Sequence, residues 1–444
     1  MNRRKAELSM LVPAGALWLF AILLGAFAVD DQVPPSFFGR AVFVIALCAV
    51  THAAVRRLAP SADAVLLPCA IALSGIGFAM VMRLNPDLAG PQTMWLATGA
   101  GAFCLTLLVL PDHRRLEQFR YSLMLLGVAL LLLPLAPLIG KEVNSARLWV
   151  QIGALNFQPA EAAKVVLAAF LAGYLASKRE VMTVPTTRIG PWMLPAPRHF
   201  GPLVMAWALS LAVMVWQRDL GSSVLFLALY IITIYVATQR ASYVVAGGAM
   251  FVGGVVFASA AFSHVHSRIA AWLNPWQDID GSGFQIAQSL FALGTGGVAG
   301  EGIGRGRPDF IRFGVPTDFI FSAIGEELGL IGAVAVLMLF AVIVARGFHI
   351  ALRSREPFGT LLAVGLTAIV GVQTFLIIGG VTRLIPLTGI TLPFVSYGGS
   401  SIVANYVLIA LLMRISAAEA GAAEPAAGQP EPHPRPDVPE EAGA

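Results

Sequence analysis

Long apolar runs alternate with short polar connections along most of the chain. The runs are continuously apolar, which favours helices over barrel strands, because backbone polar groups in lipid must be satisfied within their own segment. Twelve runs approach the roughly 20 residues that a membrane-spanning helix needs. They lie at 11–28, 38–56, 63–82, 92–110, 121–138, 160–177, 201–217, 220–238, 243–262, 319–346, 357–381 and 393–415. The pattern predicts an all-α polytopic integral membrane protein with about twelve transmembrane helices.

Composition agrees with this class. Hydrophobic residues make up 57% of the 444 positions and charged residues only 12%, which lies outside the range of soluble domains. The first run is predicted to be a retained helix, since no small-residue cleavage site is evident and Asp30-Asp31 follows it directly. The stretch 417–444 is rich in Ala, Pro, Gly and Glu and has no aromatic residue. We therefore expect a disordered cytoplasmic tail.

Basic residues set the expected orientation. They concentrate in alternate connections, whose members are Arg56, Arg57, Arg114, Arg115, Arg120, Lys178, Arg179, Arg188, Arg198, Arg240, Arg346, Arg353 and Arg355. By the positive-inside rule these connections and both termini are cytoplasmic, in a plasma membrane, and the long connection 263–317 before the tenth run lies outside. The net charge of +4 fits this anchoring and calls for no nucleic acid.

Two apparent motifs predict no chemistry of their own. Cys48, Cys69 and Cys104 fall inside apolar runs, so they indicate packing and neither a disulfide framework nor a zinc site. The glycines from Gly294 to Gly306 resemble a nucleotide loop, but no Gly-Lys-Ser/Thr follows and no strand leads into them. We expect these glycines to form tight turns near a substrate, with Arg305, Arg307 and Arg312 close by.

The outer connection ends at Asp318, directly before the apolar run that starts at Phe319. Two interpretations stay open. Thr317 or Asp318 has the chemistry of a helix N-cap, and a carboxylate at the membrane boundary has the chemistry of a general base. Glu326 and Glu327 stand about two turns further on, and we expect them to face the protein interior, because charge inside a membrane is costly.

Two pairs of charges occur where membrane helices begin. Glu161 and Lys164 are three residues apart, so they share one helical face and can pair. The pair is either structural, or the lysine faces a cavity that receives an anionic headgroup. Arg218 and Asp219 form part of a very short connection before the eighth run, where Asp219 is either a helix cap or a site residue.

A third group of candidates precedes the sixth run on the predicted outer side. Arg147 lies next but one to Trp149, which is typical of a snorkelling cation at an interface. Arg147 and Lys141 would also suit a phosphate clamp, because guanidinium and ammonium groups bind phosphate oxygens.

Taken together, the polar segments resemble the SEDS proteins, the RodA/FtsW group of bacterial cell-wall polymerases. The matching segments are Arg147-Leu-Trp149, Gln158-Pro159-Ala-Glu161-Ala-Ala-Lys164, Asp219-Leu-Gly221, Asn274-Pro275, Gly283-Phe-Gln285, Gln288-Ser289, Gly294-Thr-Gly-Gly297, Thr317-Asp318-Phe-Ile-Phe321, Gly325-Glu326-Glu327-Leu-Gly329, Pro386-Leu-Thr-Gly389 and Leu392-Pro393-Phe-Val-Ser396-Tyr397-Gly-Gly-Ser400-Ser401. Their order and spacing relative to the apolar runs make the resemblance specific.

The resemblance implies a division of the chain. It covers 63–416, a ten-helix core, and leaves 1–62 as an additional N-terminal transmembrane hairpin. Some positions depart from the family pattern: Gly314-Val315-Pro316 stands where members carry Glu and His, Ile377 replaces a common Asn, and Arg383 replaces a common Gly.

The resemblance also implies an activity, an inverting glycosyltransferase that polymerises lipid II outside the membrane, together with a class B penicillin-binding protein. The family's essential aspartate falls on Asp318, which we expect to be the general base. The expected substrate-binding residues are Lys141, Arg147, Trp149, Glu161, Lys164, Arg218, Asp219, Gln285, Ser396 and Ser400. A divalent cation, Mg²⁺ or Mn²⁺, stays open, as do two other functions, a lipid II flippase and a non-catalytic scaffold. The sequence leaves elongation, division and sporulation undecided.

Overall fold

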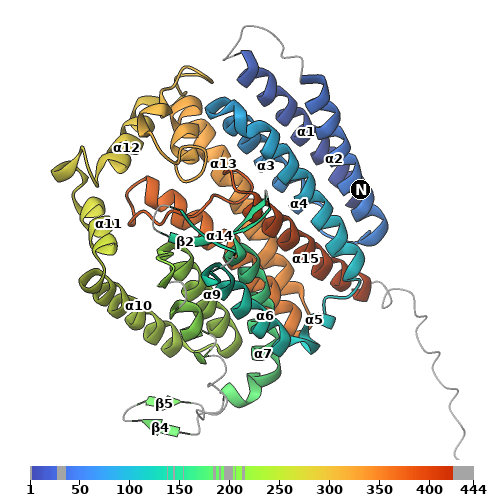
Figure 1. Ribbon diagram of the computed structural model, residues 1–444. Helices are drawn as coiled ribbons and strands as arrows, with labels where there is room; N and C mark the ends of the chain where they lie inside the picture. Colours follow the sequence, from blue (N-terminus) through green and yellow to red (C-terminus); the bar gives the residue numbers. More distant parts are fainter. Residues whose placement is uncertain are drawn as a thin grey trace, which may run out of the picture.

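A computed structural model describes residues 3–27, 37–137, 139–143, 146–153, 155–183, 187–189, 192–194, 204–205, 207–212 and 216–423. Helices dominate this part of the chain (Figure 1). The longer ones are α1 (Arg3–Phe27), α2 (Phe37–Leu58), α3 (Leu66–Leu84), α4 (Ala89–Val109), α6 (Arg120–Leu132), α7 (Pro159–Thr183), α9 (Leu220–Thr238), α10 (Ala241–Ala261), α11 (Ser263–Leu273), α12 (Phe284–Gly296), α13 (Ile320–Arg353), α14 (Pro357–Val381) and α15 (Gly399–Ala423).

The helices agree with the hydrophobic pattern of the sequence. Within the described residues, 10 helices are long and apolar enough to cross a membrane, and the apolar segment Arg120–Leu135 is shorter. The predicted fold class is therefore confirmed. The count of twelve is not established, because much of the predicted seventh run, 201–217, lies outside the described residues.

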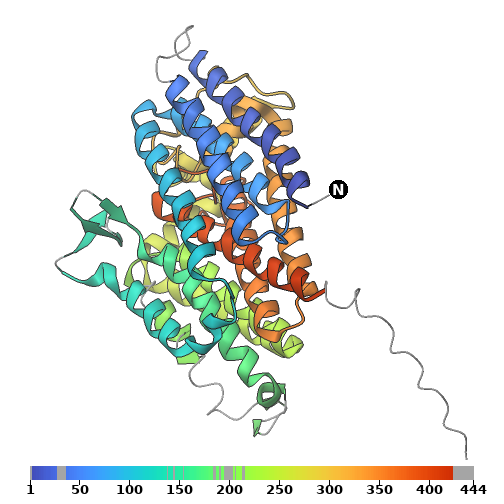
Figure 2. The same cartoon turned by 90° about the vertical axis from the view of Figure 1, so that its right-hand side faces the viewer.

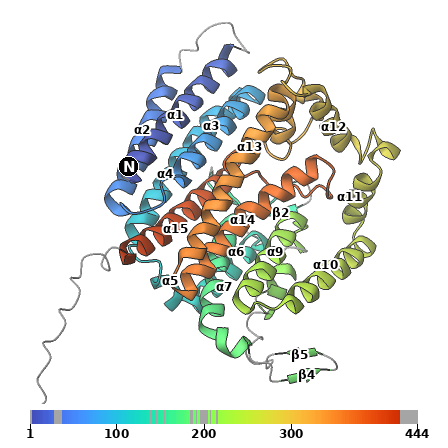
Figure 3. The same cartoon turned by 180° about the vertical axis from the view of Figure 1, so that it is seen from behind.

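The most deeply buried helices form the centre of the bundle. α14 packs against α13, α7 and α9, and α15 packs against α4 and α7. The N-terminal hairpin is peripheral: α1 packs mainly on α3, and α2 on α1 and α4. Figure 3 shows α3 between α1 and α13. By contrast, no residue of α10 is buried, so this helix presents apolar side chains to its surroundings, as a lipid-facing helix does.

The long connection 263–317 is largely helical. It contains α11, α12 and two short 3₁₀ helices at Pro275–Asp278 and Pro308–Ile311. Figure 1 shows α10, α11 and α12 following one another as an arc along one edge of the molecule. The arc closes where α12 packs against α13, so the segment that leads to Asp318 is fixed at both ends.

Two small antiparallel sheets were not predicted. Strands β1 (Gly140–Val143), β2 (Ala146–Ile152) and β3 (Leu155–Phe157) form one sheet, and β4 (Thr187–Ile189) and β5 (Trp192–Leu194) form the other. Figure 2 shows the first sheet projecting from the helical body. The β2 strand reads Ala-Arg-Leu-Trp-Val-Gln-Ile, so Leu148 and Val150 belong to one face and Arg147, Trp149 and Gln151 to the other.

The glycine-rich segment packs against a break in α13. Gly329 has a φ of 66° and a ψ of −168°, a combination open almost only to glycine. The amides of Glu301 and Gly302 donate to the freed carbonyl oxygens of Glu326 and Glu327, at 3.0 Å each. The glycines therefore allow close approach to α13. Gly297, Gly300, Gly302 and Gly304 also have a positive φ, as the predicted tight turns require, and the nearness of these turns to a substrate stays a prediction.

The two acids of this break face inward, as predicted. Glu327 lies 3.3 Å from the guanidinium of Arg83 and accepts from the amide of Gly304 at 3.0 Å. Glu326 accepts from the amide of Arg307 at 2.7 Å. Both carboxylates thus hold the glycine-rich segment onto α13.

Candidate functional site

Asp318 lies on a tight turn immediately before α13. The carbonyl oxygen of Gly314 accepts hydrogen bonds from the amides of Thr317, Asp318 and Phe319, at 3.2, 2.8 and 3.1 Å. Gly314 has a φ of 73°, which places this turn in a region that favours glycine. The N-cap position of α13 is Phe319, and no side chain caps the helix. The capping interpretation of Thr317 and Asp318 is therefore wrong.

The segment between α14 and α15 holds this turn from the other side. The amide of Tyr397 donates to the carbonyl oxygen of Pro316 at 2.8 Å. The Ser396 hydroxyl donates to the carbonyl oxygen of Thr317 and accepts from the amide of Leu392 at 2.9 Å. Ser396, predicted to bind substrate, is buried and bonded to backbone on both sides. Its role in the structure is to fix the position of Asp318.

A guanidinium that the sequence reasoning missed lies beside Asp318. A Cβ built on Gly389 would lie 3.7 Å from Oδ2 of Asp318 and 3.8 Å from Nη2 of Arg268. Arg268 comes from α11 and donates to the carbonyl oxygen of Thr388 at 3.2 Å. Gly389 has a φ of 72° and no side chain. It thus leaves an opening that the Asp318 carboxylate and the Arg268 guanidinium both border.

This environment changes the acidity of Asp318. Its side chain keeps part of its surface accessible, yet burial among protein atoms raises its pKa from 3.8 to about 6, while the Thr317 hydroxyl and Arg268 act in the opposite direction. Removal from water disfavours the charged form of a carboxyl group. A carboxylate with a pKa near neutrality is well suited to accept a proton.

The position of Arg268 depends on a departure from the family pattern. Arg383 stands where a glycine is common, and its φ of 60° is in the left-handed region. Its Nε donates to the carbonyl oxygen of Trp272 at 2.8 Å, and the Trp272 indole donates back to the Arg383 carbonyl oxygen at 3.2 Å. These bonds tie α11 to the end of α14, which holds Arg268 at the opening.

Glu161 and Lys164 pair, as their spacing predicts, at the start of α7. Lys164 is 2% exposed and donates to Glu161 and, at 2.8 Å, to Oε1 of Gln373 on α14. Gln373 in turn donates to the carbonyl oxygen of Thr391 at 2.7 Å. The pair therefore connects to the same 388–401 segment that holds the turn of Asp318.

Asp219 lies near both the Glu161–Lys164 pair and the Asp318–Arg268 group. Its Oδ1 accepts from the amide of Ser222 at 2.9 Å, which confirms the predicted cap of α9. Its Oδ2 is buried with no hydrogen-bond partner among the described residues. Burial raises the pKa of Asp219, the Ser222 bonds lower it, the charge of Glu161 raises it and Arg268 lowers it. Asp219 is therefore within electrostatic range of both the Glu161 and the Arg268 groups.

Arg218 precedes Asp219 and is exposed. Its φ of 61° turns the backbone at the start of α9. Burial lowers the pKa of His264, with further lowering by Arg218 and Arg268, so the two guanidinium groups act on one neighbourhood. Arg268 thus acts on both Asp318 and Asp219, and Arg218 acts on His264, which lies on the same helix as Arg268.

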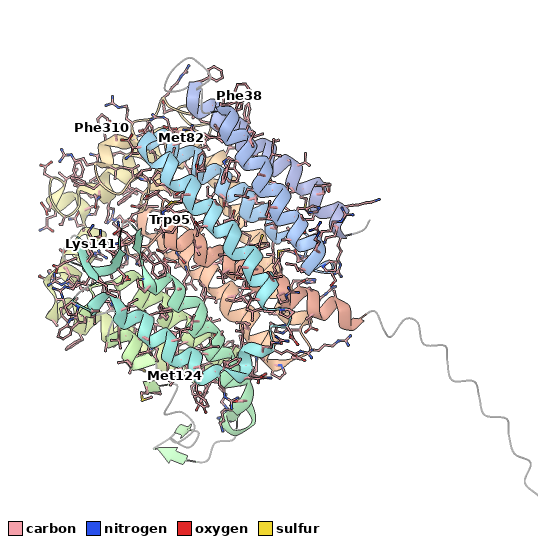
Figure 4. All side chains as sticks on the ribbon, turned by 45° about the vertical axis from the view of Figure 1, so that its right-hand side comes forward. Phe38, Met82, Trp95, Met124, Lys141 and Phe310 are labelled. Atoms are coloured by element: carbon pink, nitrogen blue, oxygen red, sulfur yellow. The ribbon has the colours of Figure 1, made fainter. Side chains whose placement is uncertain are left out.

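Three predicted substrate-binding residues lie on the first sheet, away from the Asp318 turn: Lys141, Arg147 and Trp149. Lys141 is paired in register with Trp149 across β1 and β2, and Figure 4 labels Lys141 on this sheet. The Arg147 guanidinium lies 3.2 Å from Glu142, and both are about half exposed. Within the described residues, no hydrogen bond or ion pair joins this sheet to Asp318. Their substrate role stays a prediction.

Two further candidates have structural bonds. Gln285 on α12 donates to the carbonyl oxygen of Phe313 at 2.9 Å, just ahead of the Asp318 turn. Ser400 accepts from the amide of Gln158 at 2.8 Å, which links α15 to the start of α7. These bonds hold other elements of the site in place, and a substrate role for either residue stays a prediction.

The described residues contain no cluster of three or more His, Cys, Asp or Glu side chains that could hold a metal ion. Asp318, Asp219 and Glu161 are the carboxylates of the site, but they do not form such a cluster. A divalent cation would need oxygen ligands from a bound substrate in addition. We therefore assign no chemical step to a metal.

The geometry defines a class of protein: a polytopic membrane protein whose helices hold a carboxylate of raised pKa beside guanidinium groups at the end of a membrane span. Such a site can remove a proton from a hydroxyl group next to an anionic group. A family model described as "Cell cycle protein", which groups FtsW, RodA and SpoVE, matches residues 71–421. The chain belongs to this family.

Relatives and solved structures agree. The chain is 41% identical over 426 residues to "Peptidoglycan glycosyltransferase RodA" of Mycobacterium tuberculosis, covering 94% of this chain and 91% of that protein. A solved structure described as "Structural coordination of polymerization and crosslinking by a peptidoglycan synthase complex" is 25% identical with a TM-score of 0.65, covering 81% of this chain and 98% of that one. The Thermus thermophilus rod shape determining protein RodA is 26% identical with a TM-score of 0.57, covering 80% and 97%.

Proposed function

We propose that this protein is a peptidoglycan glycosyltransferase that polymerises lipid II into glycan strands on the outer face of the cytoplasmic membrane. The observation that carries the proposal is Asp318, a carboxylate of raised pKa beside Arg268. The proposal is also supported by the 41% identity of the chain to relatives named peptidoglycan glycosyltransferases.

Asp318 is the general base in this proposal. A sugar hydroxyl of the acceptor attacks the donor carbon that carries the lipid pyrophosphate. The new carbon–oxygen bond forms as the bond to pyrophosphate breaks, the bonding electrons leave with the pyrophosphate, and the hydroxyl proton passes to Asp318. One displacement at an α-linked donor gives a β-linked product by inversion, without a covalent intermediate.

The cations of the site stabilise the departing pyrophosphate. Arg268 and Arg218 are placed to bind its oxygens, because guanidinium donates two parallel hydrogen bonds to such groups. Lys164 lies deeper, where its charge is balanced by Glu161. In a partly dry site, the attraction between these cations and the leaving group grows as negative charge develops on the pyrophosphate. Asp219 keeps Arg218 and the start of α9 in place.

Topology and partners follow from the same proposal. The charge distribution of the sequence places both termini in the cytoplasm and Asp318 outside. A class B penicillin-binding protein is the expected partner, because a polymer outside the cell must be cross-linked. Elongation is the favoured role, since the mycobacterial relative is named RodA and the Thermus thermophilus RodA is described as a rod shape determining protein.

The test is polymerisation of labelled lipid II by the purified full-length protein in detergent, with and without the candidate partner. Wild type should form glycan chains, and Asp318→Asn should form none at normal expression. Asp309→Asn is the matched control, because Asp309 is exposed on the same connection and pairs with Arg307. Chains formed without a membrane cannot come from a flippase. A wild-type protein that forms no chains under any condition would refute the enzyme, and an active Asn variant would refute the base.

A further inference from the structure

A groove runs between the additional helix α1 and the core helix α13. Its floor is α3, which both helices contact. One part is a cavity of about 570 Å³ with walls that are almost wholly apolar, and its lining extends from Val342 of α13 to Leu328 and to Ile303 of the connection 263–317. Among its residues are Leu17 and Phe20 of α1, Ala79 of α3, and Ala335 and Val342 of α13.

A second, basic pocket lies on the face that carries the N terminus. This pocket has a volume of about 1420 Å³. Seven cations line it, which are Arg3, Arg4, Lys5, Arg56, Arg346, Arg353 and Arg355, against two acids, Asp63 and Glu419. The neighbouring acid Glu7 pairs with Arg4 and accepts from His52 at 2.7 Å. Even with Glu7 included, the cations exceed the acids by four, so the pocket keeps a surplus of positive charge.

The walls of the pocket are held in place. Arg3 donates to the carbonyl oxygen of Ser61, and Arg346 pairs with Asp63, with its Nε 2.8 Å from Oδ2. The Ser61 hydroxyl donates to the carbonyl oxygen of Ala417 at 3.1 Å. These bonds join α1, the 59–65 connection, α13 and α15. A fixed concave set of cations differs in this respect from the dispersed charge that orients membrane helices.

The apolar cavity and the basic pocket share no lining residue, but α13 lines both. Val342 lines the apolar cavity and Arg346 lines the basic pocket, so they are separated by one helical turn, about 6 Å. From Arg346 to Ala335 the helix rises about 16 Å, which is close to half of the roughly 30 Å hydrocarbon core. A lipid of one leaflet has these proportions, with an anionic headgroup at one end and acyl chains along the apolar walls.

We propose that this groove binds an anionic phospholipid of the leaflet on the N-terminal side, which the proposed orientation makes the cytoplasmic leaflet. Basic pockets between membrane helices on that side are suited to phosphate headgroups. The lipid-linked substrate does not fit the same place, because its pyrophosphate is needed at Asp318. Arg346 lies near the other end of α13 from Asp318, beyond the break at Gly329. The site uses α1, which lies outside the matched residues 71–421, and it goes beyond the proposed glycosyl transfer.

The experiment measures phospholipid retention by native mass spectrometry on the purified full-length protein, offered dioleoyl phosphatidylglycerol and dioleoyl phosphatidylcholine in equal amounts. Wild type should retain phosphatidylglycerol preferentially. Two sets of substitutions separate the pocket from general surface charge. Lys5→Gln, Arg56→Gln and Arg353→Gln remove three cations of the pocket whose side chains make no described hydrogen bond, and retention should fall at least about tenfold. The control set is Arg57→Gln, Arg115→Gln and Lys178→Gln, on the same predicted face but outside the pocket, and it should retain wild-type preference.

A second variant tests the apolar part independently. Ala335→Phe narrows the groove without changing charge and should also reduce retention, whereas Val334→Phe, on the exposed surface of α13 outside the groove, should not. Equal loss in the pocket and control sets would overturn the proposal in favour of diffuse attraction. Full retention in Ala335→Phe would also overturn it. Inorganic pyrophosphate that displaces the lipid at equal concentration would overturn it as well, because a soluble anion would then suffice. The lipid II assay is separate, so failure here leaves the glycosyltransferase proposal intact.

Discussion

The raised pKa of Asp318 predicts that one substitution changes activity and stability in opposite directions. Asp318→Asn removes the base and also removes a charge that burial disfavours. The pKa rises from 3.8 to about 6, and each pKa unit corresponds to about 1.4 kcal/mol. Keeping the carboxyl ionised at neutral pH therefore costs about 3 kcal/mol of folding free energy at most. Residual solvent access lowers this figure to ~1–3 kcal/mol.

The sign follows from proton linkage. The folded protein binds a proton at this carboxyl more tightly than the unfolded chain does, so its stability falls as pH rises through the interval between 3.8 and about 6. At pH 7.5 the full cost is present, and Asp318→Asn should unfold at a higher temperature than wild type. Below about pH 4 both forms are neutral, and the difference should vanish.

The assay pairs thermal unfolding at the two pH values with lipid II polymerisation at pH 7.5. Polymerisation by Asp318→Asn should fall by at least about 10²–10⁴-fold, to below detection in the endpoint assay, and wild-type activity should decline as pH falls below about 6. Asp309→Asn should match wild type in both measurements, since its carboxylate is exposed. An Asn variant that is inactive but also less stable at pH 7.5 would refute the reasoning, because its inactivity would then reflect a damaged fold.

Three further outcomes are expected. Arg268→Gln should lower polymerisation by about 10²-fold through weaker stabilisation of pyrophosphate, and it should move the acidic limb of the pH profile upward, because Arg268 lowers the pKa of Asp318; an unchanged limb would contradict their proximity. Lys164→Met should lower the unfolding free energy by about 3–5 kcal/mol, since it leaves Glu161 buried without its cation, and adding Glu161→Gln should restore much of the loss in chemical denaturation. Gly300→Ala should cost about 1–3 kcal/mol, because its φ is 82° and its Cβ would lie 2.3 Å from the carbonyl oxygen of Glu327; a neutral result would mean that the segment adjusts.

The local sequence pattern was sufficient to predict the fold and part of the candidate site. The lengths of the apolar runs predicted the helices, the three-residue spacing of Glu161 and Lys164 predicted their pairing, and the position of Asp219 predicted its cap. Each of these depends on neighbours in the chain. The cap at Asp318 was wrong because Gly314, four residues earlier, accepts the amides of the turn and directs the carboxylate toward Gly389.

The sequence did not predict Arg268, because its place in the site depends on contacts between segments that are distant in the chain. Arg268 lies fifty positions before Asp318, and the 388–401 segment contacts both of them. The sequence offered one signal: His264 and Arg268 are four residues apart and share a face of a short helix in the outer connection. Such a face indicates a cation at the surface, but it does not indicate which carboxylate lies opposite.

The bond from Ser396 to the carbonyl oxygen of Thr317 spans 79 residues, and this has a consequence for biogenesis. Translation at about 5–20 residues per second delivers the second partner roughly 4–16 s after the first. During that interval α13 and α14 enter the membrane while the turn before α13 still lacks its support. The chain therefore carries its carboxylate in a loosely held form until the last helix is inserted, and it becomes competent only as a complete molecule.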